Sequence, residues 1–474
     1  MNPGNIVRAP PGILEHLRYG TSAIKHLGAH RPCSTSPSRG GFAAAIEMCN
    51  GVGACRKTLE GTMCPSYMAT RDEEHSTRGR ANALRAVLSG RVPPAEFTGR
   101  RLYEVMDLCL ECKGCKAECP SNVDMAKMKY EFLHHYYQAN GASAAQPAVR
   151  AHRGSSAGCR PRTAADSRNW MDATSRSTRA MLERVAGIDR RRPLPTAGSG
   201  DVHRLVRAPP PARAAAPRGE VVLFHDTFVT YNTPAIGQRR GEPCSRRPAI
   251  SVVLADHKCC GRPMISRGCW PRRASTPRWN VERLHPFAAR GVPIVGLEPS
   301  CLLTLRDEYG GSPAHRRGAG RWRRPAYLLE QFLVRERARG STLSLQRSRP
   351  RARCCTATAT RRRSRERRPR WPRSEWAGFT VAEVDSGCCG MAGSFGFETR
   401  ALRHLGGRSG VAGWFPPSRP SRPRTEIVAP GISAASRSIT SRGGGPSTPP
   451  RCSGKHSRAE PRFFDAAGSG KGER

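Results

Sequence analysis

The chain has 474 residues, 19 of which are cysteines, and a formal net charge of +43. The cysteines are too many for an ordinary cytosolic enzyme and too clustered for a secreted disulfide scaffold. The first residues lack the apolar stretch of a signal peptide, and no run approaches the roughly 18 apolar residues of a membrane span. We therefore expect a protein of a reducing compartment, in which clustered cysteines bind metal.

Residues 41–141 are predicted to form a mainly helical unit. In the segment STRGRANALRAVLSG (76–90), apolar side chains recur on one helical face, and the final glycine is a suitable helix end. After Asp124, which can cap a helix, a second apolar stripe begins and stops before Gly141. We assign both stripes to core packing. They consist of Ala81, Leu84, Val87 and Leu88, and of Met125, Met128, Phe132, Leu133 and Tyr136.

The segment CLECKGCKAECP (109–120) has the cysteine spacing C-x₂-C-x₂-C-x₃-C-P of bacterial ferredoxins. The short gaps allow three thiolates on one loop to reach three corners of a cubic cluster. In two-cluster ferredoxins the cysteine before the proline ligates the other cluster, so Cys119 predicts a partner motif. The segment CNGVGACRKTLEGTMCP (49–65) is that partner.

The partner motif lacks one cysteine. Cys49 and Cys55 match the first and third positions, Val52 stands at the middle one, and Cys64 precedes the proline. Crossed ligation then predicts a complete [4Fe–4S] site and an incomplete one, which could hold a three-iron cluster, a four-iron cluster with a non-cysteine ligand, or nothing. Zinc sites more often pair two C-x₂-C units. The complete site comprises Cys64, Cys109, Cys112 and Cys115, and the incomplete one Cys49, Cys55 and Cys119.

Beyond residue 219, five short apolar runs (VVLF, VVLA, PIVGL, VAEV and EIVA) are typical of buried parallel strands, and each is followed by a polar or cysteine-containing loop. Ligands of open α/β sheets gather at the carboxyl ends of strands. The Cys-Cys-Gly element occurs twice, which suggests a duplicated α/β unit. These cysteines could hold a metal or cluster, or be structural thiols behind a tight turn. They are Cys259, Cys260, Cys388 and Cys389, with Cys301 nearby.

The positive charge is uneven along the chain. Residues 41–140 carry 13 basic and 12 acidic side chains, whereas residues 311–380 carry 20 arginines, no lysine and 4 acidic side chains. The second stretch has neither helical nor strand periodicity. Arginine, proline and serine without lysine are typical of a GC-rich gene read in a shifted frame. We therefore interpret the charge as a product of altered coding sequence and expect no specific nucleic-acid binding.

The two cysteine motifs, together with CCGRP (259–263), GLEPSC (296–301) and DSGCCGMAGSFGFE (385–398), resemble the iron–sulfur part of FAD-linked 2-hydroxyacid oxidases of the D-lactate, glycolate and D-2-hydroxyglutarate type. The segment NPGNIVRAP (2–10) is similar to the end of their flavin domain. The family also has a His-Cys-His segment before its second Cys-Cys-Gly element, and RCCTATATRRR stands there instead.

The resemblance implies an electron-transfer component of an oxidoreductase. It implies one [4Fe–4S] cluster, a second uncertain one, and FAD only on a missing domain or partner flavoprotein. The electron acceptor would be quinone-linked or soluble, and the chain cytoplasmic or peripheral at the inner face of the membrane. No catalytic residue is assigned. The alternatives are a basic nucleic-acid-binding protein with structural zinc and a nonfunctional gene fragment.

The expected fold is α+β, with a mainly helical two-motif ferredoxin-like domain before a degraded, duplicated α/β region. The expected divisions are a flavin-domain remnant (1–40), the helical iron–sulfur domain (41–141), a linker (142–219), the first Cys-Cys-Gly domain (220–309), an Arg-rich irregular segment (310–378), a remnant of the second Cys-Cys-Gly domain (379–434) and a disordered tail (435–474).

Overall fold

The structure is a computed structural model. It describes residues 41–58, 61–141, 176–191, 194, 219–234, 250–268, 275–309, 325–339, 351–356, 379–384, 395–399 and 426–428. The flavin-domain remnant and the tail predicted for residues 1–40 and 435–474 lie outside these ranges.

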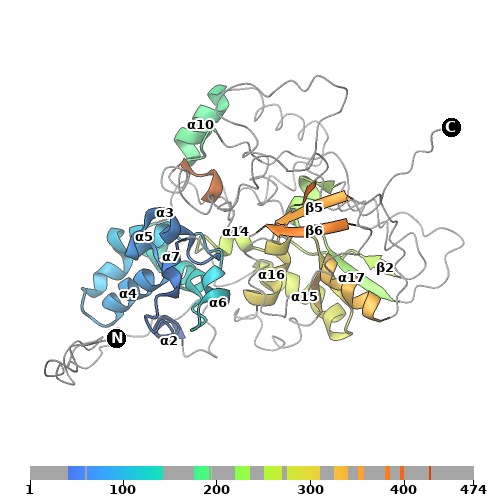
Figure 1. Cartoon of the computed structure of the whole chain (residues 1–474), viewed down its shortest axis with the longest axis horizontal. Coiled ribbons are helices and arrows are strands. Elements are labelled where there is room, and N and C mark those ends of the chain that lie inside the picture. The colour runs from blue at the N-terminus through green and yellow to red at the C-terminus, as the bar shows by residue number, and fades with distance from the viewer. Residues whose placement is uncertain are drawn as a thin grey trace, which may run out of the picture.

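A helical unit occupies residues 41–141 (Figure 1, blue to cyan). Three 3₁₀ turns connect its helices: η2 (Ala54–Arg56), η3 (Glu73–His75) and η4 (Pro94–Thr98). The helices are α2 (Gly41–Glu47), α3 (Pro65–Thr70), α4 (Thr77–Leu88), α5 (Arg100–Asp107), α6 (Gly114–Glu118) and α7 (Met125–Asn140).

The ends of α4 and α7 follow from their capping residues. The Ser76 hydroxyl accepts the backbone N–H of Gly79 at 2.9 Å, and the Asp124 carboxylate accepts that of Lys127 at 3.3 Å. Each bond satisfies a donor that the first helical turn leaves without a partner. Gly90, with φ of 76°, lies just past the end of α4, in a conformation that glycine adopts without steric cost. The predicted cap at Asp124 and the predicted helix end at Gly90 are confirmed, and the structure adds the cap at Ser76.

The core of the helical unit contains the predicted stripes together with six cysteines. Phe97 packs edge-on against Phe42 and against Phe132, with ring centroids 6.0 Å apart in each pair. Burying a large apolar side chain contributes about 1.5–3 kcal/mol, so this core fixes the helices that carry the cysteines. The cysteines in the core are Cys49, Cys55, Cys64, Cys109, Cys115 and Cys119.

A parallel sheet with the strand order β2-β1-β3-β4 forms a second unit. Two layers of apolar side chains cover its opposite faces: Val222, Phe224 and Ile294 pack with α15 and α16, while Val221 and Val295 pack with α17. The strands are β1 (Glu220–Phe224), β2 (Ser251–Val253), β3 (Ile294–Gly296) and β4 (Ala326–Leu328). The helices are α12 (Thr227–Tyr231), α14 (Arg262–Ile265), α15 (Ser275–Ala289), α16 (Pro299–Asp307) and α17 (Leu329–Ala338).

Three more parallel strands form a sheet of order β6-β5-β7: β5 (Arg351–Thr356), β6 (Phe379–Val384) and β7 (Glu426–Val428). In both sheets the first strand in the chain lies between the next two, as in β2-β1-β3. This shared order is what a duplicated unit predicts. The ferredoxin-like and Cys-Cys-Gly domain assignments themselves stay predictions.

Three segments depart from the expected divisions, and one of them is β5 (Arg351–Thr356), a strand inside the predicted irregular segment 310–378. Residues 325–339 form β4 and α17 in the predicted irregular segment, where Ala326 and Phe332 are buried. The largely apolar run AYLLEQFLV (326–334) is flanked by arginines on both sides, so the composition of the whole segment does not indicate the strand and helix within it. Helix α10 (Arg176–Ala186) likewise forms in the predicted linker. In the described part of the chain, no helix is both long and apolar enough to cross a bilayer.

Candidate metal centres built from cysteines

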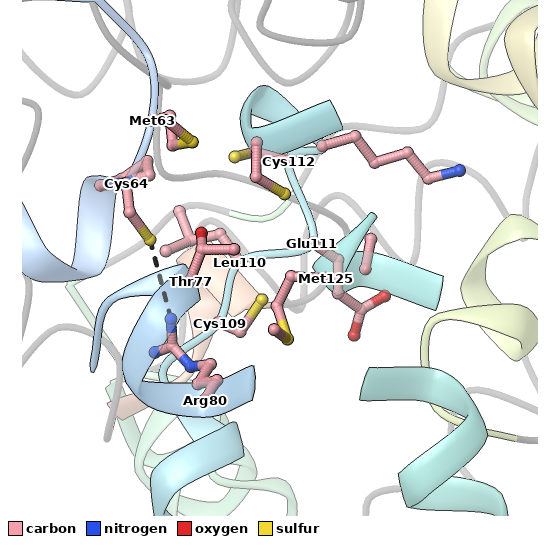
Figure 2. Close-up of a pocket in the computed structure, with 13 residues that line it drawn as sticks. Met63, Cys64, Thr77, Arg80, Cys109, Leu110, Glu111, Cys112 and Met125 are labelled. Carbon is pink, nitrogen blue, oxygen red and sulfur yellow. Dashed lines mark hydrogen bonds between the residues drawn. The ribbon is translucent and has the colours of Figure 1, made fainter. Parts of the chain in front are cut away.

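Four cysteines from the two motifs line one hollow in the helical unit. Cys64 precedes α3, Cys109 and Cys112 lie in the loop between α5 and α6, and Cys115 is in α6 (Figure 2). The hollow has about 320 Å³ of empty space, part of it open to solvent. These are the four thiols predicted for the complete site. That each of them is a ligand stays a prediction.

The backbone between Cys109 and Cys115 is tightly curled. Glu111 and Lys113 have φ of 53° and 60°, a region that residues with side chains rarely adopt. Such conformations persist where the surrounding structure imposes them, often at functional sites. The loop also lies close to the upstream motif, because a Cβ added at Gly114 would be 3.0 Å from the Thr62 methyl group. The curled loop brings three cysteines of the downstream motif to the same hollow.

A second hollow, with about 250 Å³ of empty space, is lined by Cys49, Cys55 and Cys119. Val52, which stands where the motif lacks its cysteine, also lines this hollow, and 60% of its surface is exposed. The three thiols are those predicted for the incomplete site, and the crossed grouping of Cys119 follows the ferredoxin pattern. Thr77, at the start of α4, lines both hollows.

The four thiols that line the first hollow are suitable ligands for a cluster of soft metal ions. Burial raises the pKa of the Cys109 thiol to about 11 and raises that of Cys115 well above its usual value. Without a bound cation these buried groups stay protonated, whereas a coordinated thiol is deprotonated. Four thiolates in one site favour iron–sulfur clusters or zinc over hard cations. The residues at this hollow therefore fit the cofactor that the motif predicts.

The α/β unit brings Cys259, Cys260 and Cys301 together near the carboxyl ends of its strands. The Cys260 thiol interacts with both other thiols. The contact with Cys259 lowers its pKa, but the contact with Cys301 and burial outweigh this effect and raise the pKa well above the usual value. The Tyr309 hydroxyl donates to the Cys260 carbonyl oxygen at 3.1 Å, which holds the turn in place. Their assignment as metal ligands stays a prediction. Cys388 and Cys389 lie outside the described residues.

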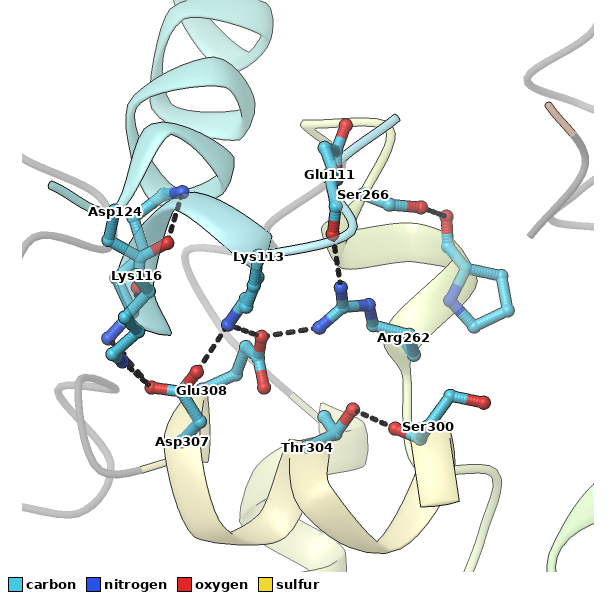
Figure 3. A network of polar contacts seen from close by, with 12 residues as sticks. Glu111, Lys113, Lys116, Asp124, Arg262, Ser266, Ser300, Thr304, Asp307 and Glu308 are labelled. Atoms are coloured by element: carbon cyan, nitrogen blue, oxygen red, sulfur yellow. Dashed lines mark hydrogen bonds and ion pairs between the residues drawn. The ribbon is translucent and has the colours of Figure 1, made fainter. Parts of the chain in front are cut away.

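A buried polar network joins the first hollow to the α/β unit (Figure 3). The ammonium group of Lys113, the residue after Cys112, contacts the carboxylates of Asp307, which ends α16, and of Glu308, which follows that helix. Arg262, in the turn after Cys260, donates to Glu308 and, at 3.3 Å, to the Glu111 carbonyl oxygen. The two cysteine loops are thus tied to one helix.

A second set of contacts extends this network. Lys116 donates to Asp307 at 2.6 Å and lies 3.1 Å from Asp124, while Lys127 lies 3.4 Å from Asp307. Asp124 is buried, which by itself would raise its pKa, yet the neighbouring lysines lower it to about 2. The helical and α/β units therefore meet through paired charges.

Sequence reasoning missed the charged partners of the cysteines. Arg80, Lys113 and Glu308 are all buried, but lysine, arginine and glutamate are mostly exposed in proteins. Nothing in the local pattern distinguishes them from surface residues. Only their positions in the chain could have indicated a role near the cysteines, since Lys113 lies inside the ferredoxin motif and Arg80 lies between the two motifs.

A comparison with known protein families identifies the class of domain that contains the two hollows. Residues 48–124, which include all seven cysteines of the two hollows, match the family described as a 4Fe-4S dicluster domain. The chain therefore carries a domain for iron–sulfur clusters, as the cysteine spacing predicted.

The individual relatives are redox proteins. One anaerobic glycerol-3-phosphate dehydrogenase subunit, from Escherichia coli K12, is 28% identical over 236 residues, covering 48% of this chain and 57% of that protein. D-2-hydroxyglutarate dehydrogenase from Pseudomonas putida KT2440 is 26% identical over 409 residues, covering 76% and 38%. A probable glycolate oxidase iron-sulfur subunit from Bacillus subtilis 168 is 38% identical over 69 residues, covering 14% and 15%.

These matches confirm the resemblance to FAD-linked oxidoreductases and identify an iron–sulfur electron-transfer module. The chain spans 38% of the D-2-hydroxyglutarate dehydrogenase and 57% of the glycerol-3-phosphate dehydrogenase subunit. No solved structure matches the chain.

Proposed function

We propose that this chain relays electrons from the flavin of a 2-hydroxyacid oxidoreductase to a quinone-linked or soluble acceptor. The observation that supports this most is the grouping of Cys64, from one motif, with Cys109, Cys112 and Cys115, from the other, around one hollow. The names of the relatives support the substrate class, because D-2-hydroxyglutarate and glycolate are both 2-hydroxyacids. The flavin would belong to a partner or to a domain beyond the described residues.

A bound [4Fe–4S] cluster supplies one-electron chemistry, which divides the two electrons of a flavin hydroquinone into single steps. The protein holds it with thiolates and controls its surroundings. Met63, Leu110 and Met125 line the hollow and limit access of water. Burial and hydrogen bonding to sulfur then set the reduction potential.

Two features of the structure support an order of electron transfer. The two hollows of the helical unit adjoin at Thr77, so clusters in both would be neighbours. The network around Glu308 ties the loop of Cys112 to the turn that holds Cys260. We infer that electrons pass within the helical unit and then toward the α/β unit.

The test uses the full chain purified without oxygen, with reduced flavin mononucleotide as donor and a water-soluble quinone analogue as acceptor. We expect bound iron and acid-labile sulfide, loss of visible absorbance on mixing with the donor, and its recovery with the acceptor. Cys112→Ser should lose most of the iron, whereas Cys354→Ser should keep it. Bound zinc without sulfide, or equal iron in the two variants, would contradict the proposal.

A further inference from the structure

Arg80 is a buried cation at the hollow of Cys64. None of its surface is exposed, and it is among the residues that line the hollow. Figure 2 shows its guanidinium directed toward Cys64. Its Nη1 lies 3.7 Å from the Cys64 sulfur. An arginine in this position is unusual, because a buried charge is costly unless it is paired and hydrogen-bonded.

The protein holds this guanidinium firmly. Its Nε donates to the Val105 carbonyl oxygen at 2.9 Å, and its Nη1 donates to the His75 carbonyl oxygen at 2.6 Å and to the Ser66 hydroxyl at 3.1 Å. These acceptors are all neutral. The group is fixed in place while its positive charge is not cancelled by any carboxylate among these hydrogen-bond partners.

One nitrogen of Arg80 has no acceptor among the residues that the structure describes. Within the described residues, the buried Nη2 makes no hydrogen bond. A buried donor without a partner costs about 1–3 kcal/mol, and more when the group is charged. Because Arg80 lines the hollow, an acceptor bound there, such as a cluster sulfide or a coordinated thiolate, would satisfy this donor.

The second hollow offers a contrast on the same helix. Arg78 lines it and donates its backbone N–H to the Cys55 sulfur at 3.3 Å. Its guanidinium, however, pairs with Glu73, with Nε 2.8 Å from Oε1. The charge of Arg78 is therefore largely balanced by a carboxylate, whereas that of Arg80 is available to the first hollow.

We propose that Arg80 donates a charged hydrogen bond to the cluster held by Cys64, Cys109, Cys112 and Cys115, and thereby raises its reduction potential above that of a cluster in the second hollow. The proposal rests on the proposed function, since it requires a bound cluster. Reduction adds one negative charge to a buried site that already contains four thiolates. A fixed cation nearby stabilises the reduced state more than the oxidised one.

The test is a redox titration of the full chain, with the reduced clusters followed by electron paramagnetic resonance. In Arg80→Gln, which loses the charge, we expect reduction of the cluster to be about tenfold less favourable, which is about 59 mV for a one-electron couple. Arg80→Lys keeps the charge and should stay close to wild type.

Arg85→Gln is the matched control, because Arg85 is also buried in α4 but binds Glu47 and the Cys49 carbonyl oxygen. It should lower stability without shifting the potential of the first cluster. An unchanged midpoint in Arg80→Gln, or equal shifts in all three variants, would overturn the proposal.

Loss of the cluster from an Arg80 variant also tests the proposal. If Arg80→Gln holds no iron, Arg80→Lys has to hold a cluster with a midpoint close to wild type. A cluster-free Arg80→Lys protein would instead assign Arg80 to folding. Absence of any cluster from the wild-type chain would contradict the proposed function itself.

Discussion

The ammonium group of Lys113 lies against the carboxylate of Glu308, and neither side chain has any exposed surface. The pair joins residues that are 195 positions apart in the chain. Lys113 is the neighbour of Cys112 in the ferredoxin-type loop, and Glu308 follows α16, the helix that carries Cys301. The pair therefore connects the two cysteine-containing parts of the chain through a single buried contact.

We expect Glu308→Gln to destabilise the chain by about 3 kcal/mol, because it leaves the buried cation of Lys113 and the partly buried cation of Arg262 without their shared carboxylate. Urea unfolding monitored by circular dichroism measures the effect. The control is Glu282→Gln, which removes an exposed pair with Arg278 and should cost less than about 0.5 kcal/mol. Equal unfolding midpoints for the two variants would count against a stabilising role for the buried pair.

Gly79→Ala should reduce both stability and bound iron. A Cβ at this position would lie 2.0 Å from the Glu73 carbonyl oxygen, so η3 has to move away from α4. Overpacking of this kind costs about 1–3 kcal/mol. The shift would also displace His75, whose carbonyl oxygen holds Arg80. Thermal unfolding and iron content check the prediction, with Gly219→Ala as control because nothing lies within 4 Å of its added Cβ. If Gly79→Ala keeps the iron content and stability of the wild type, the close approach of η3 to α4 at Gly79 is not required for either.

Val52→Cys should increase bound iron and sulfide, because it restores the missing thiol at the hollow of Cys49, Cys55 and Cys119. A fourth thiolate completes the set that a [4Fe–4S] cluster requires. Val334→Cys adds a thiol to a partly exposed position in α17 and should leave the iron content unchanged. The measurement is the ratio of iron to protein after anaerobic reconstitution. The same ratio in both variants would show that position 52 cannot supply a ligand.

The sequence predicts local features well and long-range ones poorly. The spacing within one loop predicts that Cys109, Cys112 and Cys115 lie together, and the two-cluster ferredoxin pattern predicts the crossed positions of Cys64 and Cys119. The end of α4 at Gly90 and the start of α7 at Asp124 follow from glycine and capping chemistry. The Lys113–Glu308 pair could not be predicted, since two distant residues give no local signal. Strand β4 was missed because its short apolar run lies among arginines.

The central claim is that Cys64 belongs to the complete site and Cys119 to the incomplete one. The most direct measurement compares Cys64→Ser and Cys119→Ser by electron paramagnetic resonance of the reduced proteins, with iron and sulfide quantified in each. We expect Cys64→Ser to lose the four-iron signal of the complete site, and Cys119→Ser to retain it while losing any iron bound in the second hollow. Loss of the four-iron signal in Cys119→Ser together with its retention in Cys64→Ser would contradict the crossed arrangement and the site built on it.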